Sequence, residues 1–168
     1  MAEVFLRRLT RWQAEQQRHG VANMYVECHG RDAAGFLDRF ERHVQEPDFD
    51  MVTADSSDGL VGCLYGFRPE RGGELHESVR GLLPADAAVA TSAAGRLFLL
   101  VELMVREEYR GRGVATRMRD LLLARHGADV VVAGFAEGGQ DVLRAWGCTK
   151  LGEVAAASGE AWLFPRAG

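Results

Sequence analysis

The sequence has 168 residues, of which 47% are hydrophobic and 26% are charged. This balance excludes a disordered or fibrous chain, and at this length one domain buries about two thirds of its unfolded surface without a metal or disulfides. The net charge of -4 is scattered along the chain, which argues against a nucleic-acid surface and favours a cationic partner. We therefore predict a single domain over residues 1–168.

The cysteines and the N-terminal segment indicate a compartment. Cys28, Cys63 and Cys148 lie far apart, without a CxxC motif or a Cys/His pair at metal-ligand spacing, so we expect reduced thiols and no metal. No apolar h-region and no window of about 18 apolar residues is present. These features predict a cytoplasmic protein without membrane contact, and nineteen arginines to one lysine suggest a GC-rich bacterial source.

The first half of the chain reads as a strand, two helices and a hairpin. Val4–Leu9 predicts a strand, and the mixed polar segment Arg11–His29 predicts a helix. Asp32 can cap the next helix, which Pro47 ends and whose apolar face is formed by Phe36, Leu37, Phe40 and Val44. Met51–Ala54, a turn and the run LVGCLYGF then form an antiparallel hairpin.

The second half alternates strands and helices. A long connection over 68–95 contains a short helix around ELHESVRGLL that Pro84 ends. Leu97–Val105 has the apolar content of a buried central strand, and the helix Val114–Arg125 follows with Gly127 as its C-cap. The remaining predicted elements are the strand Asp129–Ala133, the helix Gln140–Trp146, and the strands Leu151–Val154 and Ala161–Phe164.

The segment VREEYRGRGVATRMRDLLL joins the central strand to the next helix through Gly111 and Gly113. Such a junction leaves backbone N–H groups unpaired at a helix N-terminus, where an anion binds, and glycine allows close approach. A tight structural turn is the plain alternative. A dinucleotide fingerprint would need glycine where Thr116 stands, and the lysine of a P-loop is missing. The pattern predicts a phosphate or pyrophosphate site.

This segment resembles the pyrophosphate-binding motif of the GNAT superfamily of acyl-CoA N-acyltransferases. The superfamily pattern of Arg or Gln, two residues, Gly, one residue, Gly or Ala matches Arg110, Gly113 and Ala115. The hairpin MVTADSSDGLVGCLYGF and the order of elements fit the same superfamily. The resemblance implies a single-domain mixed α/β (α+β) fold, with an antiparallel N-terminal meander, splayed central strands and flanking helices.

The resemblance also implies acetyl-CoA, or a related acyl-CoA, as co-substrate and no metal. Its pantetheine would pair with the backbone of the strand 97–105, and its pyrophosphate would bind N–H groups of the following turn. The implied binding residues are Leu103, Met104, Val105, Arg110, Gly111, Arg112, Gly113, Val114, Ala115 and Thr116.

Glu102 interrupts the apolar run of the central strand. A carboxylate in a buried strand is costly unless it is paired or used. An attacking amine with a pKa of about 10 is protonated at neutral pH, so a base has to remove its proton. We predict that Glu102 is this base, and the alternative is a carboxylate that pairs with an arginine or caps backbone N–H groups.

The C-terminal segment departs from the superfamily pattern. Most relatives carry an Asn, an Ala and then a Tyr that protonates the leaving thiolate, followed by a Gly-Phe pair. The same register here gives Ala136, Gly139, Leu143, Gly147 and Cys148. The thiolate would therefore take its proton from water, from Cys148 or from another residue, or catalysis has been lost.

The superfamily's acceptor groove is lined by the early helices and by the connection before the central strand. Side chains there that could attract a cationic amine, although each also suits an ordinary solvated surface, are Tyr25, Glu27, His29, Glu74, His76 and Glu77.

We predict transfer of an acetyl group from acetyl-CoA to a primary amine of a small molecule, such as an antibiotic or another natural product, by direct attack in a ternary complex. A peptide acceptor and transfer to a hydroxyl or a carrier-bound group are variants. The alternative is a degenerate domain that binds acyl-CoA or a small ligand as a sensor or sequestering module. A homodimer is common for such folds, although no residue here establishes one.

Overall fold

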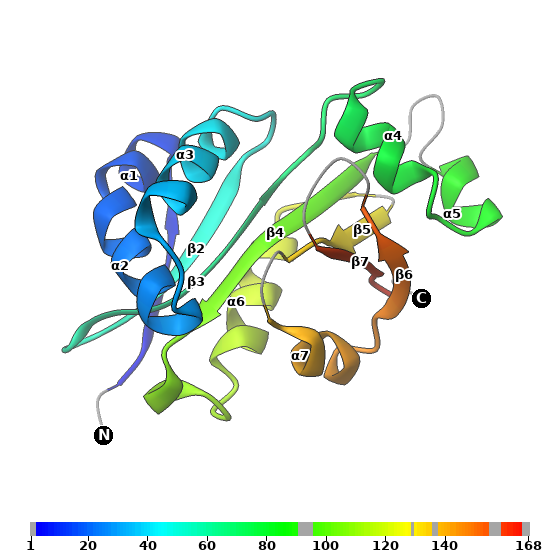
Figure 1. Cartoon of the computed structure of the whole chain (residues 1–168). Helices are drawn as coiled ribbons and strands as arrows, with labels where there is room; N and C mark the ends of the chain where they lie inside the picture. Colours follow the sequence, from blue (N-terminus) through cyan, green and yellow to red (C-terminus); the bar gives the residue numbers. More distant parts are fainter. Residues whose placement is uncertain (1–2, 91–95, 129, 136–137, 155–158, 166–168) are drawn as a thin grey trace.

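The computed structural model describes residues 3–90, 96–128, 130–135, 138–154 and 159–165. A seven-stranded sheet has the order β1-β2-β3-β4-β5-β7-β6, and its neighbours are antiparallel except β4 and β5, which are parallel (Figure 1). The predicted mixed α/β fold with an antiparallel meander is confirmed. The strands are β1 Phe5–Leu9, β2 Asp50–Ser56, β3 Gly59–Phe67, β4 Leu97–Val105, β5 Val130–Ala133, β6 Thr149–Glu153 and β7 Glu160–Leu163.

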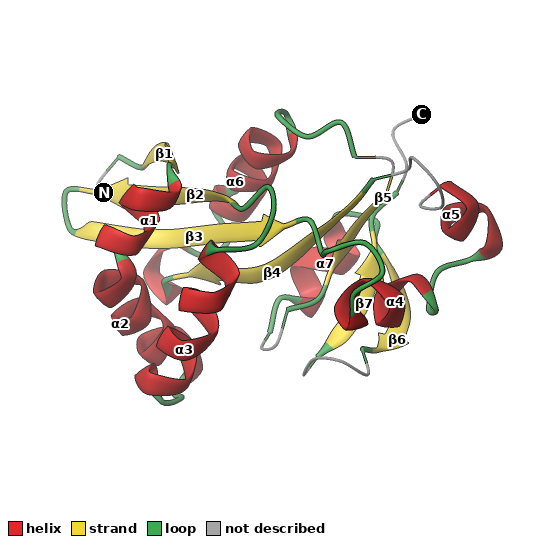
Figure 2. Cartoon of the chain, turned by 90° about the horizontal axis from the view of Figure 1, so that it is seen from above, coloured by secondary structure: helices red, strands yellow, loops and turns green. Residues whose placement is uncertain are grey.

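Helices cover both faces of the sheet. Figure 2 shows α2 and α3 on one side of β3 and β4 and α6 on the other. None of the helices in the described ranges is long and apolar enough to cross a membrane. The helices are α1 Arg11–Gln16, α2 Arg18–His29, α3 Ala33–Val44, α4 Glu74–Arg80, α5 Ala85–Ala90, the 3₁₀ turn η1 Glu107–Tyr109, α6 Val114–Leu123 and α7 Gln140–Ala145.

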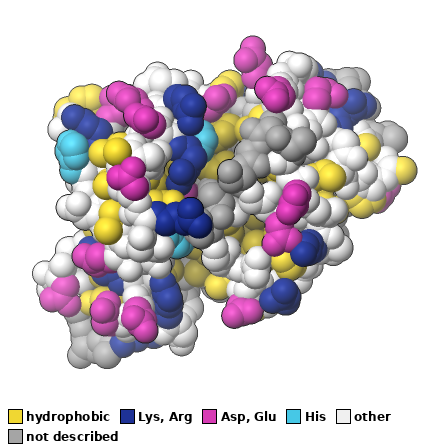
Figure 3. Space-filling model, in the orientation of Figure 1, with side chains coloured by type: hydrophobic (Ala, Val, Ile, Leu, Met, Phe, Trp, Pro, Cys, Tyr) yellow, Lys and Arg dark blue, Asp and Glu magenta, His cyan; other side chains and the backbone are white. Residues whose placement is uncertain are grey.

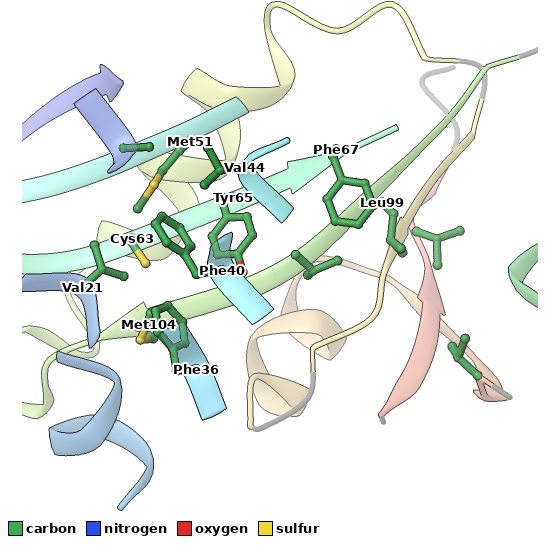
Figure 4. Close-up of a cluster of buried hydrophobic side chains, with 14 of the residues drawn as sticks. Val21, Phe36, Phe40, Val44, Met51, Cys63, Tyr65, Phe67, Leu99 and Met104 are labelled. Atoms are coloured by element: carbon green, nitrogen blue, oxygen red, sulfur yellow. The ribbon is translucent and has the colours of Figure 1, made fainter. Parts of the chain in front are cut away.

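The amphipathic helix α3 forms the centre of one core. Its start is fixed by Asp32, whose side chain accepts from the Ala34 N–H, as the sequence predicted. Phe36 and Phe40 are buried at helical spacing, and the ring of Phe40 meets that of Tyr65 on β3 edge-on at 5.3 Å between centroids (Figure 4). This packing holds α3 above the central strands.

The segment 11–29 is helical as predicted, but it forms two helices, α1 and α2, that meet at Gln17. The predicted short helix before Pro84 is α4, which ends at Arg80, and the additional helix α5 begins directly after Pro84. One local prediction was wrong. Gly127 is not the C-cap of α6, which ends at Leu123 with Ala124 in a right-handed conformation. Asp129 lies outside the described residues.

A cluster of charges ties β1, β2 and the end of α6 together. Asp50 is buried at the start of β2, where it pairs with Arg8 of β1 and, at 2.7 Å, with Nε2 of His126. Arg8 also donates to the carbonyl of Leu121, and the His126 ring lies 4.0 Å from that of Phe98 between centroids. The chain therefore leaves the α6 axis before Gly127, because His126 is held against β2 and β4.

Asp50→Asn should lower the free energy of unfolding by about 3 kcal/mol, because it leaves the Arg8 guanidinium and the His126 ring partly buried without their carboxylate partner. The measurement is urea unfolding at neutral pH. Asp48→Asn is the matched control, since Asp48 pairs with Arg68 at the surface and should cost about 0.5 kcal/mol or less. Equal losses in the two variants would contradict a structural role for the cluster.

His43 on α3 is largely enclosed, and its Nδ1 is hydrogen-bonded to the hydroxyl of Tyr65 at 2.8 Å. Burial, followed by the charges of Arg39 and Arg42, lowers the pKa of His43 to about 4. In the unfolded chain this pKa is about 6.5, so the unfolded state takes up a proton first as the pH falls. The stability that depends on neutral His43 is complete above about pH 6.5 and is lost toward pH 4.

His43→Gln should remove this part of the acid sensitivity while keeping a polar partner for Tyr65. Between pH 7 and about pH 4.5 the unaltered chain should lose about 2 kcal/mol of unfolding free energy through His43, and the variant should lose less by that amount. The comparison requires denaturant unfolding at both pH values, with the exposed His19→Gln as control. An identical pH dependence in all three proteins would contradict the assignment.

Candidate active site

The strands β4 and β5 diverge in the middle of the sheet. They pair only from Leu97 to Leu100, where Leu100 lies opposite Ala133, and the last bond is 2.7 Å from the Gly134 N–H to the Leu100 carbonyl. β4 continues to Val105 with β3 as its neighbour on the other edge. Within the described residues, no strand pairs with the second half of β4 on the β5 side, which is the splay that the superfamily resemblance implied.

The backbone of β4 alternates between its two edges beside this opening. The Arg106 N–H donates to the Val61 carbonyl of β3, so the Val105 carbonyl points the other way, where it accepts from Nε of Arg110 at 2.9 Å and from Sγ of Cys28 at 3.6 Å. The N–H and carbonyl of Leu103 share this edge, because alternate residues of a strand point to the same side. Met104, by contrast, lies opposite Cys63 of β3 and turns its backbone groups to that strand.

The loop after β4 is anchored by Tyr109. Its buried hydroxyl makes hydrogen bonds of 3.1 Å with Asp58 and 3.0 Å with Ser56 in the hairpin of β2 and β3, and the Arg112 guanidinium lies 5.3 Å above its ring. These contacts fasten the loop to the hairpin. The chain is thereby directed into α6 at a fixed angle.

The turn into α6 exposes a row of backbone N–H groups. Gly111 and Gly113 both have φ of 75°, a left-handed conformation that glycine adopts without strain, and an added Cβ would meet nothing within 4 Å at either position. In the described part of the chain, no backbone carbonyl accepts from the N–H groups of residues 111–116. This turn, which we call the anion cradle, therefore has the backbone geometry on which the predicted anion site depends. Of the predicted members, the Val114 side chain packs into the core, and Thr116 Oγ1 accepts from the indole N–H of Trp146 at 3.1 Å.

Glu102 lies in an ion-pair cluster on the face covered by α2 and α3. Its side chain is 0% exposed, its Oε2 is 3.2 Å from Nη2 of Arg39, and its Oε1 is 3.7 Å from Nε2 of His29. The Arg39 guanidinium also lies 5.4 Å above the ring of Tyr25. The arginine pairing that we considered as the alternative role is observed, and the catalytic role stays a prediction.

The charge of Glu102 is felt by two buried groups beside it. Burial, and then the Glu102 carboxylate, raise the pKa of Cys63 and of Tyr65 well above their usual values. Both groups are therefore neutral at physiological pH and add no second negative charge beside the carboxylate. The compensation comes from α2 and α3.

A β-bulge sets the direction of Glu102. The pairing of β3 with β4 shifts between Tyr65 and Gly66, which leaves Val101 as an extra residue. Leu99, Val101 and Met104 belong to the core under α1–α3, whereas Leu100 and Leu103 belong to the core under α6. Without the bulge, strict alternation would place Glu102 on the same face as Leu100.

The structure brings together only some of the predicted acceptor residues. Tyr25 and His29 meet edge-on at 4.9 Å between ring centroids beside Glu102. Glu27 instead pairs with Arg106 and lines a separate groove of about 610 Å³ that also contains Asp58 and Arg112.

The predicted residues on α4 lie elsewhere. Glu74 is exposed, and His76 is buried with its Nδ1 3.4 Å from Glu77. His76 lines a pocket of about 180 Å³ with Arg68 and with Leu97 at the beginning of β4. On the face drawn in Figure 3, Lys and Arg side chains gather along the edge of α3.

Arg39 is the member of the cluster that sequence reasoning missed. The sequence feature that could have indicated its role is its position at the edge of the apolar stripe of α3, one turn from Phe36 and next to Phe40. That pattern alone is also typical of a cation at the boundary with solvent. Its partner could be recognised only once β4 was placed beneath the helix.

Comparison with known proteins supports the same architecture. No protein-family model and no curated protein matches the chain. Among solved structures, NAA60 of Arabidopsis thaliana in complex with acetyl-CoA has a TM-score of 0.57 at 14% identity, covering 96% of this chain and 97% of that one. FeeM, an N-acyl amino acid synthase from uncultured soil microbes, has a TM-score of 0.66 at 12% identity and coverages of 98% and 90%. The aminoglycoside N-acetyltransferase AAC(6')-Iy in complex with CoA has a TM-score of 0.53 at 13% identity and coverages of 86% and 87%. The chain has the GNAT fold.

Within the GNAT fold, the C-terminal departures can now be located. Leu143, which replaces the tyrosine of most relatives, is buried in α7 and lines a small pocket with Phe135 and Trp162. The thiol of Cys148 lies in the same core, where burial, opposed by Arg119, raises its pKa to about 11. Ala136 lies outside the described residues. The thiol is thus a protonated core group.

Gly113→Asp should abolish measurable CoA binding in calorimetry, because it places a carboxylate beside the N–H groups that would bind the pyrophosphate. Gly113→Asn is the matched control, since asparagine has the same shape, tolerates the left-handed conformation and carries no charge. We expect the Asn variant to keep at least tenfold higher affinity than the Asp variant. Equal affinities, with both variants folded by circular dichroism, would contradict the assignment of the cradle.

Proposed function

We propose that the chain transfers an acetyl group from acetyl-CoA to a primary amine of a small molecule, by direct attack within a ternary complex. The observation that carries this proposal is the anion cradle at residues 111–116, which opens beside the unpaired edge of β4. A pyrophosphate and a pantetheine chain together require these two features, one for charge and one for amide pairing. The complexes of NAA60 with acetyl-CoA and of AAC(6')-Iy with CoA, on the same fold, support the choice of co-substrate.

The edge of β4 would also serve the chemistry. A thioester beside Leu103 would have its carbonyl polarised by a backbone N–H on that edge, and a preorganised donor of this kind is worth about 2.7–4 kcal/mol where it has been removed in other enzymes. The acceptor amine has to lose a proton before it attacks, and Glu102, next to Leu103 on β4, is our candidate for the group on which this step depends. No covalent acyl-enzyme is required.

The class of acceptor is part of the proposal. A small amine-bearing molecule, such as an antibiotic or another natural product, is favoured by the chain's net charge of -4 and by the likeness to an aminoglycoside N-acetyltransferase. The transfer would take place in the cytoplasm, where acetyl-CoA and reduced thiols are found.

A second candidate is a domain that binds acyl-CoA without catalysis. The buried Leu143 in place of a tyrosine favours it, because a leucine cannot protonate a thiolate. The two candidates predict the same affinity for CoA. They differ in whether any acceptor leads to release of a thiol.

The deciding experiment measures acetyl-CoA and CoA binding by calorimetry and then thiol release with a panel of amines that includes aminoglycosides and polyamines. Binding followed by release on one class of amine is the expected result. Binding without release across the panel would favour the second candidate. Lack of binding would overturn both.

Glu102→Gln should lower kcat by about 10²- to 10⁴-fold and flatten the rise of rate with pH, because it removes the charge on which proton removal depends. The measurement is the pH profile of kcat/KM on the amine identified by the panel. CoA affinity should be unchanged, since the cradle lies elsewhere, and the melting temperature reports any loss of stability. A pH profile identical to that of the unaltered chain would contradict a role for Glu102 in proton transfer.

A further inference from the structure

We propose that the acceptor amine also carries a carboxylate, as an amino acid does, and that Arg39 and Arg42 of α3 bind this group; the inference deepens the proposed acetyl transfer and rests on it. The proposed transfer takes place beside Leu103, next to Glu102 on β4. Nη2 of Arg39 lies 3.2 Å from Oε2 of Glu102, so α3 presents a guanidinium next to the place where the acceptor would bind. The charges along this edge of α3 therefore help to select the acceptor.

Arg39 is held in place without using all of its hydrogen-bond donors. Besides the contact with Glu102, its guanidinium lies 5.4 Å from the centroid of the Tyr25 ring and 5.6 Å from that of Phe36. A guanidinium has five N–H groups, and 28% of the Arg39 side chain is exposed. Donors therefore remain for a ligand at the surface, and the carboxylate and the two rings fix their orientation.

Arg42 lies about one turn further along α3. It is exposed, and within the part of the chain that the structure describes its side chain has no ion pair and no hydrogen bond. Burial, followed by the charges of Arg39 and Arg42, lowers the pKa of His43 to about 4. Both guanidiniums therefore lie close to this ring, and neutral His43 adds no charge of its own.

This edge of α3 is positive, as the Lys and Arg side chains along it in Figure 3 show. Glu102 offsets one of the two guanidinium charges, so that of Arg42 remains. Asp38, one turn before Arg42 on the helix, forms no ion pair with it in the described ranges. The local charge is therefore opposite in sign to the net charge of -4 of the whole chain.

A carboxylate matches this edge in charge and in shape. It brings one negative charge, and its two oxygens can accept parallel hydrogen bonds from a guanidinium. A polyamine or an aminoglycoside would instead bring further ammonium groups to a positive edge, where like charges oppose binding. A phosphate carries more negative charge than the single uncompensated guanidinium balances. Among amines, the edge therefore favours one that carries a single carboxylate.

The first measurement is thiol release from acetyl-CoA with free amino acids and with their carboxamides, which keep the amine and lose the negative charge. The unaltered chain should show a kcat/KM at least about tenfold higher on the preferred amino acid than on its carboxamide. Arg42→Gln should lower the value for the amino acid by about 10- to 100-fold and leave that for the carboxamide within about threefold. The matched control is Arg125→Gln, which removes an exposed arginine just after α6, on the other face of the sheet, and should keep the original ratio.

A second measurement does not depend on turnover. In calorimetry, the complex with CoA should bind the amino acid more tightly than its carboxamide, and Arg42→Gln should weaken only the amino acid. Carboxamides or polyamines that react as well as amino acids, or a ratio unchanged by Arg42→Gln, would overturn this inference alone. Faster release with O-phosphoethanolamine than with every amino acid would overturn the choice of a carboxylate. CoA binding without thiol release from any amine would instead overturn the proposed function and this inference with it.

Discussion

The extra residue Val101 determines which side chains of β4 lie on each face of the sheet. β4 alternates normally up to Leu100, and the bulge then reverses its phase so that Glu102 points toward α2 and α3. The bulge needs Gly66 opposite it, because a Cβ there would lie 2.4 Å from the Leu99 carbonyl. Pairing with β5 also stops at this point. One local irregularity therefore coincides with both the buried carboxylate and the start of the opening.

The carboxylate in turn constrains the helices. An ion moved into a protein interior without partners costs several kcal/mol, so Glu102 can exist only if neighbouring elements supply charge and hydrogen bonds. α3 supplies Arg39 from the edge of its apolar stripe, and α2 supplies His29 from its last turn. The contacts that make the carboxylate tolerable therefore join α2, α3 and β4 in one cluster.

The sequence predicted elements whose signal is local and periodic. The apolar spacing of α3 with its Asp32 cap, the run of β4 and the glycine turn before α6 each occupy one continuous stretch, and each was found within a few residues of its predicted bounds. The errors fell where a distant contact decides the backbone. No glycine or proline marks the break between α1 and α2 at Gln17. α6 ends before Gly127 because His126 contacts Asp50, which lies far away in the sequence.

The same distinction separates the two halves of the candidate site. The cradle at 111–116 is built from backbone groups of one continuous loop, so its residues could be named from the sequence. The Glu102 cluster joins three elements, and it depends on a bulge that the sequence pattern does not reveal, so Arg39 was missed. Glu27 and Glu74 were predicted to lie near Tyr25 and His29, but neither contacts this cluster. His29 was named for the acceptor groove, but its contact with Glu102 could not be inferred.

A leucine at position 143 cannot protonate a leaving thiolate, but the proposed acetyl transfer does not require a separate acid, as the protons of the acceptor's ammonium group show. An acceptor that enters as an ammonium ion carries one proton more than the base must remove, and that proton remains on the nitrogen when the C–N bond forms. The departing thiolate, with its sulfur next to this nitrogen in the tetrahedral intermediate, can take it directly. A separate acid then adds speed but is not required for balance. The essential requirement is the first deprotonation, and this is the step in which we propose that Glu102 takes part.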